Sequence, residues 1–303
     1  MPSEYRPATS VETFLRRINQ VLQSNKKGQL YYRGHEWKSF DAVPSVSRLE
    51  AHEYNEDSMI KQLLTDHPFE FEQDRTTFEK LVRAQHYGLP TRLLDVTKNP
   101  LIALYFACQG PSEEKDKDGE VIVFAPGAER IKFFDSDTLS CIANLSMLTF
   151  NQKEYLKKHF EDCRDLVKSV YPEDRGKYIQ ALVENFNAVE DVERLVHYVR
   201  MEKPGFRARI NPIDLVNIVA VSPRKLHKRL IAQNGAFLAF GLYWENPEKP
   251  FFPMDDFEIT EIYIKRQSKK KILKELNSLG INTETLFPEI DKSAKVISDI
   301  YKG

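Results

Sequence analysis

The sequence contains little cysteine and no spacing typical of a metal site. Cys108, Cys141 and Cys163 are its three cysteines among 303 residues. Their odd number and wide separation argue against a disulfide framework and against a CxxC type of zinc site. A metalloprotease pattern such as HExxH does not occur either. We therefore expect three buried, inert thiols and predict no metal site.

The sequence also lacks an excess of either charge and a long apolar run. Its 44 basic and 45 acidic side chains give no global basic field that would favour non-specific binding to nucleic acid or membranes. No apolar run approaches the roughly 18–20 residues of a membrane span. The N-terminal MPSEYRPATS does not show the basic-then-apolar pattern of a signal peptide. These features predict a cytoplasmic protein that does not bind membranes.

Hydrophobic periodicity predicts an α+β fold with a helical insertion. We expect the strands of its core to form a small, mixed and split β-sheet. Strand-like runs occur at residues 28–32, 93–96, 120–125, 216–221, 236–242 and 259–264, and helical runs at 10–22, 57–65, 71–86, 99–110 and 268–279. Between residues 136 and 202 the pattern is helical and highly charged, without a convincing strand. We expect an N-terminal helix (1–25), a first core segment (26–130), the insertion (131–205) and a second core segment (206–303). The insertion would serve as a lid, a dimer surface or a docking element for a partner protein.

Polar side chains are crowded into the apolar segment from residue 85 to 108. Among them are His86, Arg92, Asp95 and Thr97. Burying such groups costs free energy unless each of them is paired. In one interpretation Arg92 and Asp95 form an internal ion pair that fixes the turn, and His86 caps the end of its helix. In the other, these side chains bind a ligand.

Arg33 and Gly34 follow a predicted strand and form a second candidate site. Glycine permits a close approach of the backbone to a ligand, and arginine offers a planar fork for carboxylate or phosphate. Trp37 follows closely and could provide a stacking face for a base in the same pocket. It could equally anchor a loop.

These segments together resemble the FRG family, which is named for an aromatic-Arg-Gly motif. The matching residues are Tyr32-Arg33-Gly34, AQHYGLPTRLLDVT at 84–97, Asn99-Pro100, ALYFA at 103–107, QNGAF at 233–237 and TLFPEID at 285–291. The resemblance covers about residues 28–295, except for the helical stretch in the middle. It implies a module associated with microbial defence or toxin-like proteins.

A weaker similarity links the same positions to ADP-ribosyltransferases. These enzymes carry an Arg or His at the end of a first strand, a polar strand before a helix of the form AxxFA, and a Glu or Gln at a later strand. In this chain, Arg33, Thr97 and Gln233 stand in that order. The similarity implies that Arg33 holds the diphosphate or ribose of NAD, Thr97 fixes the nicotinamide ribose and Gln233 bonds a ribose hydroxyl. Gly34, His86, Arg92, Asp95 and Trp37 are the further candidates for binding NAD.

The chain departs from that pattern in two places. It has Asp-Val-Thr where the transferases have Ser-Thr-Ser, and Gln233 where many of them have glutamate. Glutamine can neither act as a base nor offer a full negative charge to an oxocarbenium-like transition state. Glu261, on a later predicted strand, is the alternative acid for that role.

Three functions remain open from the sequence. The first is NAD-dependent ADP-ribosyl transfer to a protein or nucleic acid, or simple NAD cleavage. The second is a metal-independent hydrolase or nuclease that uses Arg33, His86, Asp95 and Gln233, since histidine can serve as a general base near neutral pH. The third is a non-catalytic module that binds a nucleotide or a partner protein.

Overall fold

A computed structural model of the chain describes residues 7–25, 28–38, 42–110, 117–171, 173–225, 227–242, 257–288 and 298. The helices are α1 (Val11–Ser24), α2 (Glu50–Tyr54), α3 (Glu56–Asp66), α4 (Thr77–His86), α5 (Pro100–Cys108), α6 (Asp137–Asn144), α7 (Phe150–Val170), α8 (Arg175–Phe186), α9 (Glu190–Glu202), α10 (Pro212–Leu215), α11 (Lys228–Ala232), α12 (Lys269–Ser278) and α13 (Thr283–Leu286). The strands are β1 (Tyr31–His35), β2 (Leu93–Thr97), β3 (Gly119–Pro126), β4 (Ile131–Phe133), β5 (Ile218–Ser222), β6 (Gly235–Phe240) and β7 (Phe257–Ile264). The predicted mixed α+β class is confirmed.

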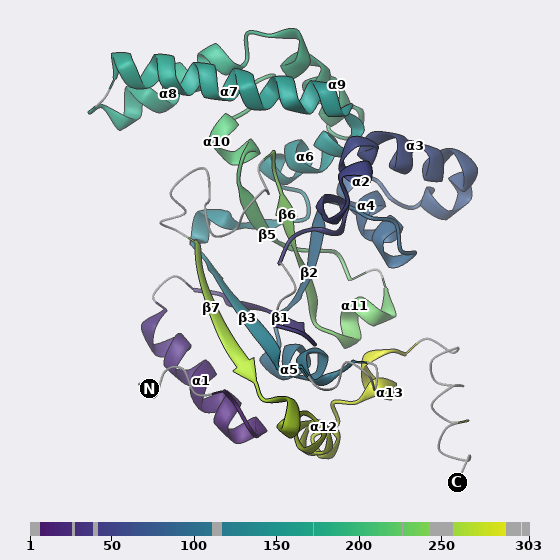
Figure 1. Ribbon diagram of the computed structural model, residues 1–303. Helices are drawn as coiled ribbons and strands as arrows, with labels where there is room; N and C mark the ends of the chain where they lie inside the picture. Colours follow the sequence, from purple (N-terminus) through teal and green to yellow (C-terminus); the bar gives the residue numbers. More distant parts are fainter. Residues whose placement is uncertain are drawn as a thin grey trace.

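The strands form one seven-stranded sheet in the order β4-β5-β6-β2-β1-β3-β7. The β4–β5 pair is parallel, and the other pairs are antiparallel. At the centre of the sheet, β1 and β2 are joined only through the pair Tyr32 and Thr97, whereas β1 and β3 share five pairs from Tyr31 to His35. The predicted split of the sheet therefore corresponds to the β1–β2 junction, where the two halves begin to separate (Figure 1).

Two separate groups of helices cover one face of this sheet. Helices α1, α5 and α12 pack on β1, β3 and β7, with Phe14, Ala103, Val121, Ile262 and Ile272 in their core. Helices α3, α4 and α6 pack on β2, β5 and β6, with Ile60, Phe78, Leu93, Ile142 and Phe237 in theirs. Residues directly opposite each other on antiparallel strands share a face. Because Tyr32 pairs with Thr97, both groups lie on the same side of the sheet.

Local sequence signals explain where several helices begin. The Ser10 side chain accepts a hydrogen bond from Thr13 N and begins α1, and Thr76 forms a capping box with Glu79 at the start of α4. Asn99 caps α5, with Pro100 in its first turn. These three starts agree with chemistry that is readable in the sequence.

Several predicted boundaries were wrong. The first strand begins at Tyr31 and contains Arg33 and Gly34 rather than ending before them. The helix predicted from residue 71 begins at Thr77, after a separate short 3₁₀ turn. Strand β4 was missed, although its three residues pair with β5 inside the range assigned to the insertion. The predicted tail motif continues to residue 291, and its part beyond 288 lies outside the described residues.

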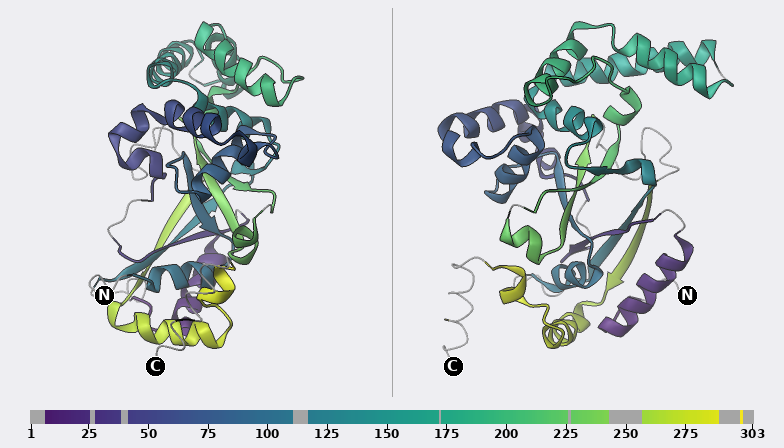
Figure 2. Two further views of the ribbon diagram at one scale, coloured as in Figure 1. Left: turned by 90° about the vertical axis from the view of Figure 1, so that its right-hand side faces the viewer. Right: turned by 180° about the vertical axis from the view of Figure 1, so that it is seen from behind.

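Helices α7, α8 and α9 form a subdomain at the opposite end of the molecule from α1 and α12 (Figures 1 and 2). The subdomain has its own apolar core, which includes Leu156, Phe160, Leu182, Phe186 and Leu195. The prediction that residues 136–202 are helical agrees with this arrangement. No helix within the described ranges is both long and apolar enough to cross a membrane.

Candidate functional site

A cleft of about 290 Å³ opens on the helix-covered face of the sheet, between the two groups of helices. Its lining residues are Tyr32, Arg33, Gly34, Val82, Gln85, His86, Asp95, Val96, Thr97, Phe106, His227, Arg229, Leu230, Gln233 and Phe237. They come from β1, β2, α4, α5, β6 and the region of α11. The cleft therefore brings together six of the sequence-predicted site residues: Arg33, Gly34, His86, Asp95, Thr97 and Gln233.

Gly34 brings β1 close to helix α5. A Cβ atom at this position would collide with Ala103 O and would lie 2.7 Å from Ala107 N. Gly119 on β3 meets the same helix at Ala107 O. The glycine of the Arg-Gly motif thus permits close packing of strand and helix, and its close approach to a ligand stays a prediction for a residue that lines the cleft.

Arg33 occupies the gap where β1 and β2 separate. Its side chain begins on the face opposite to Tyr32, because successive residues of a strand alternate. Its Nη1 donates a hydrogen bond to Asp95 O at 2.7 Å, and its Nε donates to His35 Nε2 at 2.7 Å. Burial lowers the pKa of Arg33 to about 10, although the nearby Asp95 carboxylate opposes the shift. The guanidinium therefore stays charged at neutral pH and is fixed in the wall of the cleft.

Asp95 supplies the carboxylate of the cleft and is held by Gln85. Gln85 Nε2 donates to Asp95 Oδ2 at 2.7 Å, and Gln85 Oε1 accepts a short hydrogen bond from the Thr91 hydroxyl. Asp95 is exposed, whereas the other residues of β2 are buried. Two parts of the AQHYGLPTRLLD segment thus cooperate to present one carboxylate to the cleft.

Thr97 and Gln233 are linked through the backbone at the floor of the cleft. The Thr97 hydroxyl donates to Gln233 O at 2.7 Å and accepts from Asn99 N at 3.0 Å. Gln233 Nε2 donates to Leu286 O at 3.1 Å. Both side chains therefore have a structural role, and Thr97, only 6% exposed, offers little surface to a ligand.

Two histidines stack at the cleft wall. The rings of His86, at the end of α4, and His227, before α11, are nearly parallel, with centroids 5.4 Å apart. Burial lowers the pKa of His227, and the neighbouring Arg83 guanidinium lowers it further. His227 is therefore neutral at neutral pH and can accept a proton there. Beside it, the Arg229 guanidinium lies 4.9 Å from the centroid of the Phe287 ring.

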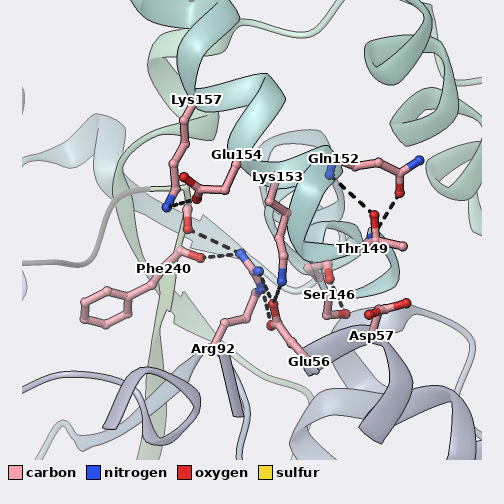
Figure 3. Close-up of polar contacts among 12 residues, drawn as sticks. Glu56, Asp57, Arg92, Ser146, Thr149, Gln152, Lys153, Glu154, Lys157 and Phe240 are labelled. Atoms are coloured by element: carbon pink, nitrogen blue, oxygen red, sulfur yellow. Dashed lines mark hydrogen bonds and ion pairs between the residues drawn. The ribbon is translucent and has the colours of Figure 1, made fainter. Parts of the chain in front are cut away.

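Arg92 lies away from the cleft, in a fully buried ion cluster (Figure 3). Its Nε and Nη2 bind the two carboxylate oxygens of Glu56 at 2.8 and 2.6 Å, and Lys153 Nζ binds Glu56 Oε2 at 2.6 Å. Arg92 also donates to Phe240 O at 3.0 Å. The predicted Arg92–Asp95 ion pair was wrong, because the two side chains leave the strand on opposite faces.

The Glu56–Arg92–Lys153 cluster joins the core to the helical subdomain. Lys153 belongs to α7, whereas Glu56 begins α3 and Arg92 precedes β2. The two cations hold the pKa of Glu56 at about 2, against the effect of its burial. Arg92 is therefore part of the framework behind the cleft, and the structure does not support its prediction as a ligand-binding residue.

The structure places Trp37 and Glu261 outside the cleft lining. The ammonium group of Lys117 lies 3.3 Å from the centroid of the Trp37 ring and covers the face predicted to stack on a base. Glu261 pairs with Ile122, which itself pairs with Arg33, so two strand spacings separate Glu261 from β1. Its carboxylate accepts a short hydrogen bond from the Tyr263 hydroxyl at the sheet edge. The order of the strands, which the sequence pattern did not fix, separates Glu261 from the site, because β3 lies between β1 and β7.

Sequence reasoning missed or undervalued four residues that shape the site. His227 and Arg229 line the cleft, whereas His35 and Glu120 support Arg33 from behind. His227 and Arg229 lie in the basic run from residue 224 to 229, whose sequence is open to two interpretations, a solvated helix face or part of a phosphate-binding surface. A useful signal was present for His35, since alternation places it on the same face of β1 as Arg33. Within the described part of the chain, no group of three or more His, Cys, Asp or Glu side chains could hold a metal ion.

Comparison with known proteins identifies one module. Residues 28–116 match the family model described as FRG domain. This range contains β1, β2, α4 and α5, and hence Arg33, Gln85, Asp95 and Thr97 of the cleft. Neither the curated proteins nor the solved structures give a significant match to the chain. The chain therefore carries an FRG domain, which spans residues 28–116 and provides most of the polar groups of the cleft.

Proposed function

We propose that the cleft binds NAD as a substrate and cleaves its nicotinamide–ribose bond, with transfer of ADP-ribose to a protein or nucleic acid, or to water. One observation carries this proposal. Arg33, Thr97 and Gln233, which stand in the sequence order of the ADP-ribosyltransferase motifs, all line the same cleft. They come from β1, β2 and the turn before β6, so their proximity results from the fold rather than from the sequence spacing.

The size of the cleft is consistent with part of such a substrate. Small-molecule sites usually have volumes of about 300–1,000 Å³, and the cleft, at about 290 Å³, is close to the lower limit of this range. It suits a nucleoside-sized group, with the remainder of a dinucleotide extending towards solvent. The aromatic rings of Tyr32 and Phe106 in its lining provide apolar surface for a ring system.

The charges in the cleft suggest how the substrate would lie. The Arg33 guanidinium would bind the diphosphate, because arginine matches phosphate oxygens with fixed N–H groups. The Asp95 carboxylate would face the ribose, where positive charge develops as the glycosidic bond breaks. Asp95 would thus supply the negative charge that the sequence analysis assigned to Glu261. The Gln233 carboxamide can accept a hydrogen bond from a ribose hydroxyl. Thr97 acts mainly by fixing the backbone at Gln233.

The test is to incubate the purified chain with NAD and to measure nicotinamide release and the transfer of labelled ADP-ribose to added proteins and nucleic acids. Wild type is expected to release nicotinamide, and Arg33→Ala to lose about 10²-fold or more of the rate. Arg16→Ala is the matched control, because the Arg16 side chain is 73% exposed on α1. NAD binding without turnover would favour a non-catalytic nucleotide-binding module. The absence of both NAD binding and NAD turnover would overturn the proposal.

A second candidate function rests on the stacked histidines. His227 is neutral at neutral pH and lines the cleft with His86 and Asp95, so it could act as a general base in phosphodiester hydrolysis without a metal. This candidate predicts cleavage of RNA or DNA in the presence of a chelator, and loss of that cleavage in His227→Gln. Nicotinamide release that persists in His227→Gln would favour the NAD reaction instead.

A further inference from the structure

Behind the cleft, Arg33 is the first member of a short chain of side chains on β1 and β3. Its Nε lies 2.7 Å from His35 Nε2, and His35 Nδ1 lies 3.1 Å from Glu120 Oε1. His35 and Glu120 face each other directly across the two strands. Both are buried, with exposed fractions of 5% and 3%. The chain therefore runs from a buried carboxylate through an imidazole to the cleft arginine.

The donor chemistry of arginine fixes the tautomer of His35. The Nε of a guanidinium carries a hydrogen and can only donate, so His35 Nε2 must be the acceptor. The ring proton is then on Nδ1 and is donated to the Glu120 carboxylate. His35 is consequently a neutral imidazole in its Nδ1–H form, oriented by a carboxylate in the same way as many functional histidines.

The neutral state of His35 matters for the charge of Arg33. The two acceptors described for Arg33, His35 Nε2 and Asp95 O, are both uncharged. In contrast, Arg92 binds a carboxylate through two of its nitrogens. The hydrogen bonds of Arg33 therefore fix its orientation without direct neutralisation, and an anion that enters the cleft meets a preorganised cation.

We propose that His35 and Glu120 are positioning residues that hold the Arg33 guanidinium as a binding group for a phosphate or diphosphate. Glu120 sets the tautomer of His35, His35 sets the rotamer of Arg33, and Arg33 contacts the anion. This inference rests on the proposed function only for the statement that the anion belongs to NAD. Inorganic pyrophosphate, which carries the same phosphate groups without the nucleosides, serves as an independent probe.

The first test is nitrogen-15 NMR of the histidine-labelled full-length chain at neutral pH, with His35→Gln used to assign the His35 signals. The expected result is a His35 ring that is protonated at Nδ1 and not at Nε2. Protonation at Nε2 alone, or a doubly protonated ring, would overturn the proposal, because neither form can accept a hydrogen bond from Arg33 at Nε2. This measurement does not depend on any ligand.

The second test is calorimetric titration of pyrophosphate into variants of His35. His35→Leu removes the acceptor and is expected to weaken binding about tenfold, the effect of one charge-assisted hydrogen bond. His35→Gln is expected to restore most of the affinity, because its carboxamide can accept from Arg33 and donate to Glu120. Arg16→Ala should bind pyrophosphate as wild type does.

Because His35→Leu leaves the Glu120 carboxylate without the histidine N–H, the folding of this variant is checked by circular dichroism. If it does not fold, Glu120→Gln, which leaves the His35 tautomer unspecified, takes its place.

A double-mutant cycle separates positioning from a general structural effect. In the Arg33→Ala background, His35→Leu should cause no further loss of pyrophosphate affinity, since His35 acts only through Arg33. Additive losses, or no pyrophosphate binding by the wild type, would overturn the inference. If pyrophosphate binds with this coupling but NAD is not cleaved, the inference holds and the proposed function fails. If wild type and His35→Leu cleave NAD equally well, the proposed function holds and the inference about His35 fails.

Discussion

Arg33 and Arg92, which both lie in the range that matches the FRG domain, are held in opposite ways. Arg92 is fully buried and bound by the Glu56 carboxylate, and it joins the core to the helical subdomain. Arg33 is bound by two uncharged acceptors and lines the cleft. The direct partner of each guanidinium thus distinguishes them. A carboxylate partner makes Arg92 part of the framework, whereas neutral partners leave the charge of Arg33 available to an anion.

The largest effect is expected from removing the anion of the framework cluster. Glu56→Gln leaves Arg92 and Lys153 buried side by side without their carboxylate, and should reduce the free energy of unfolding by about 3–5 kcal/mol. Urea denaturation followed by circular dichroism measures this loss. Glu12→Gln, on the exposed face of α1, is the control and should change stability by less than about 0.5 kcal/mol. Equal losses in both variants would remove the distinction between framework and surface.

The same cluster should make stability depend on pH in acid. The pKa of Glu56 is lowered from 4.5 to about 2 in the folded chain. The contribution of ionised Glu56 to the free energy of unfolding is therefore complete above pH 4.5. It is lost as the pH falls from 4.5 towards 2, by about 3 kcal/mol in total. The stability difference between wild type and Glu56→Gln should shrink across this window. A difference that stays constant down to pH 2 would show that Glu56 is not held ionised.

A smaller effect on stability is expected from the glycine of the Arg-Gly motif, Gly34. Gly34→Ala forces a Cβ atom against Ala103 O of α5 and should destabilise the chain by about 1–3 kcal/mol, as overpacking does. Thermal unfolding measures the loss. Gly205→Ala is the matched control, because no atom lies within 4 Å of the Cβ that it adds. A fully stable Gly34→Ala variant would argue that β1 and α5 do not pack as closely as described.

The smallest effect on stability is expected at Asp95, on the opposite face of the strand from Arg92. Asp95→Asn keeps an acceptor for Gln85 and should change the free energy of unfolding by less than about 0.5 kcal/mol. Nicotinamide release should nevertheless fall by about 10²-fold, because the charge facing the ribose is lost. Both quantities are measured on one preparation. A large stability loss without a rate loss would place Asp95 in the framework with Arg92.

Much of the architecture followed from local sequence signals. The helix start at Asn99-Pro100 and the apolar periodicity placed most helices and strands, because these signals act over a few residues. Strand β4 has only three residues, too few to show a period. The lengths of the strands could be predicted, but their order and register could not, since these depend on contacts between distant segments.

The same difference between local signals and contacts of distant segments applies to the site. The order of Arg33, Thr97 and Gln233 suggested a common cleft, and the structure brings them together. The Arg92–Asp95 pairing failed although strand alternation already places the two side chains on opposite faces. Glu56 could not be identified as the partner of Arg92, because the pair joins a helix and a strand across a long stretch of sequence. Glu261 was misplaced because nothing in its own segment reveals which strands separate it from Arg33.

The central claim is that the Arg33 side of the molecule binds the substrate. A crystal structure of the chain with a non-hydrolysable NAD analogue tests it most directly. We expect the diphosphate on the Arg33 guanidinium, the nicotinamide ribose beside Asp95 and Gln233, and an unchanged Glu56–Arg92 cluster. An analogue bound elsewhere, or bound in the cleft without contact to Arg33, would contradict it.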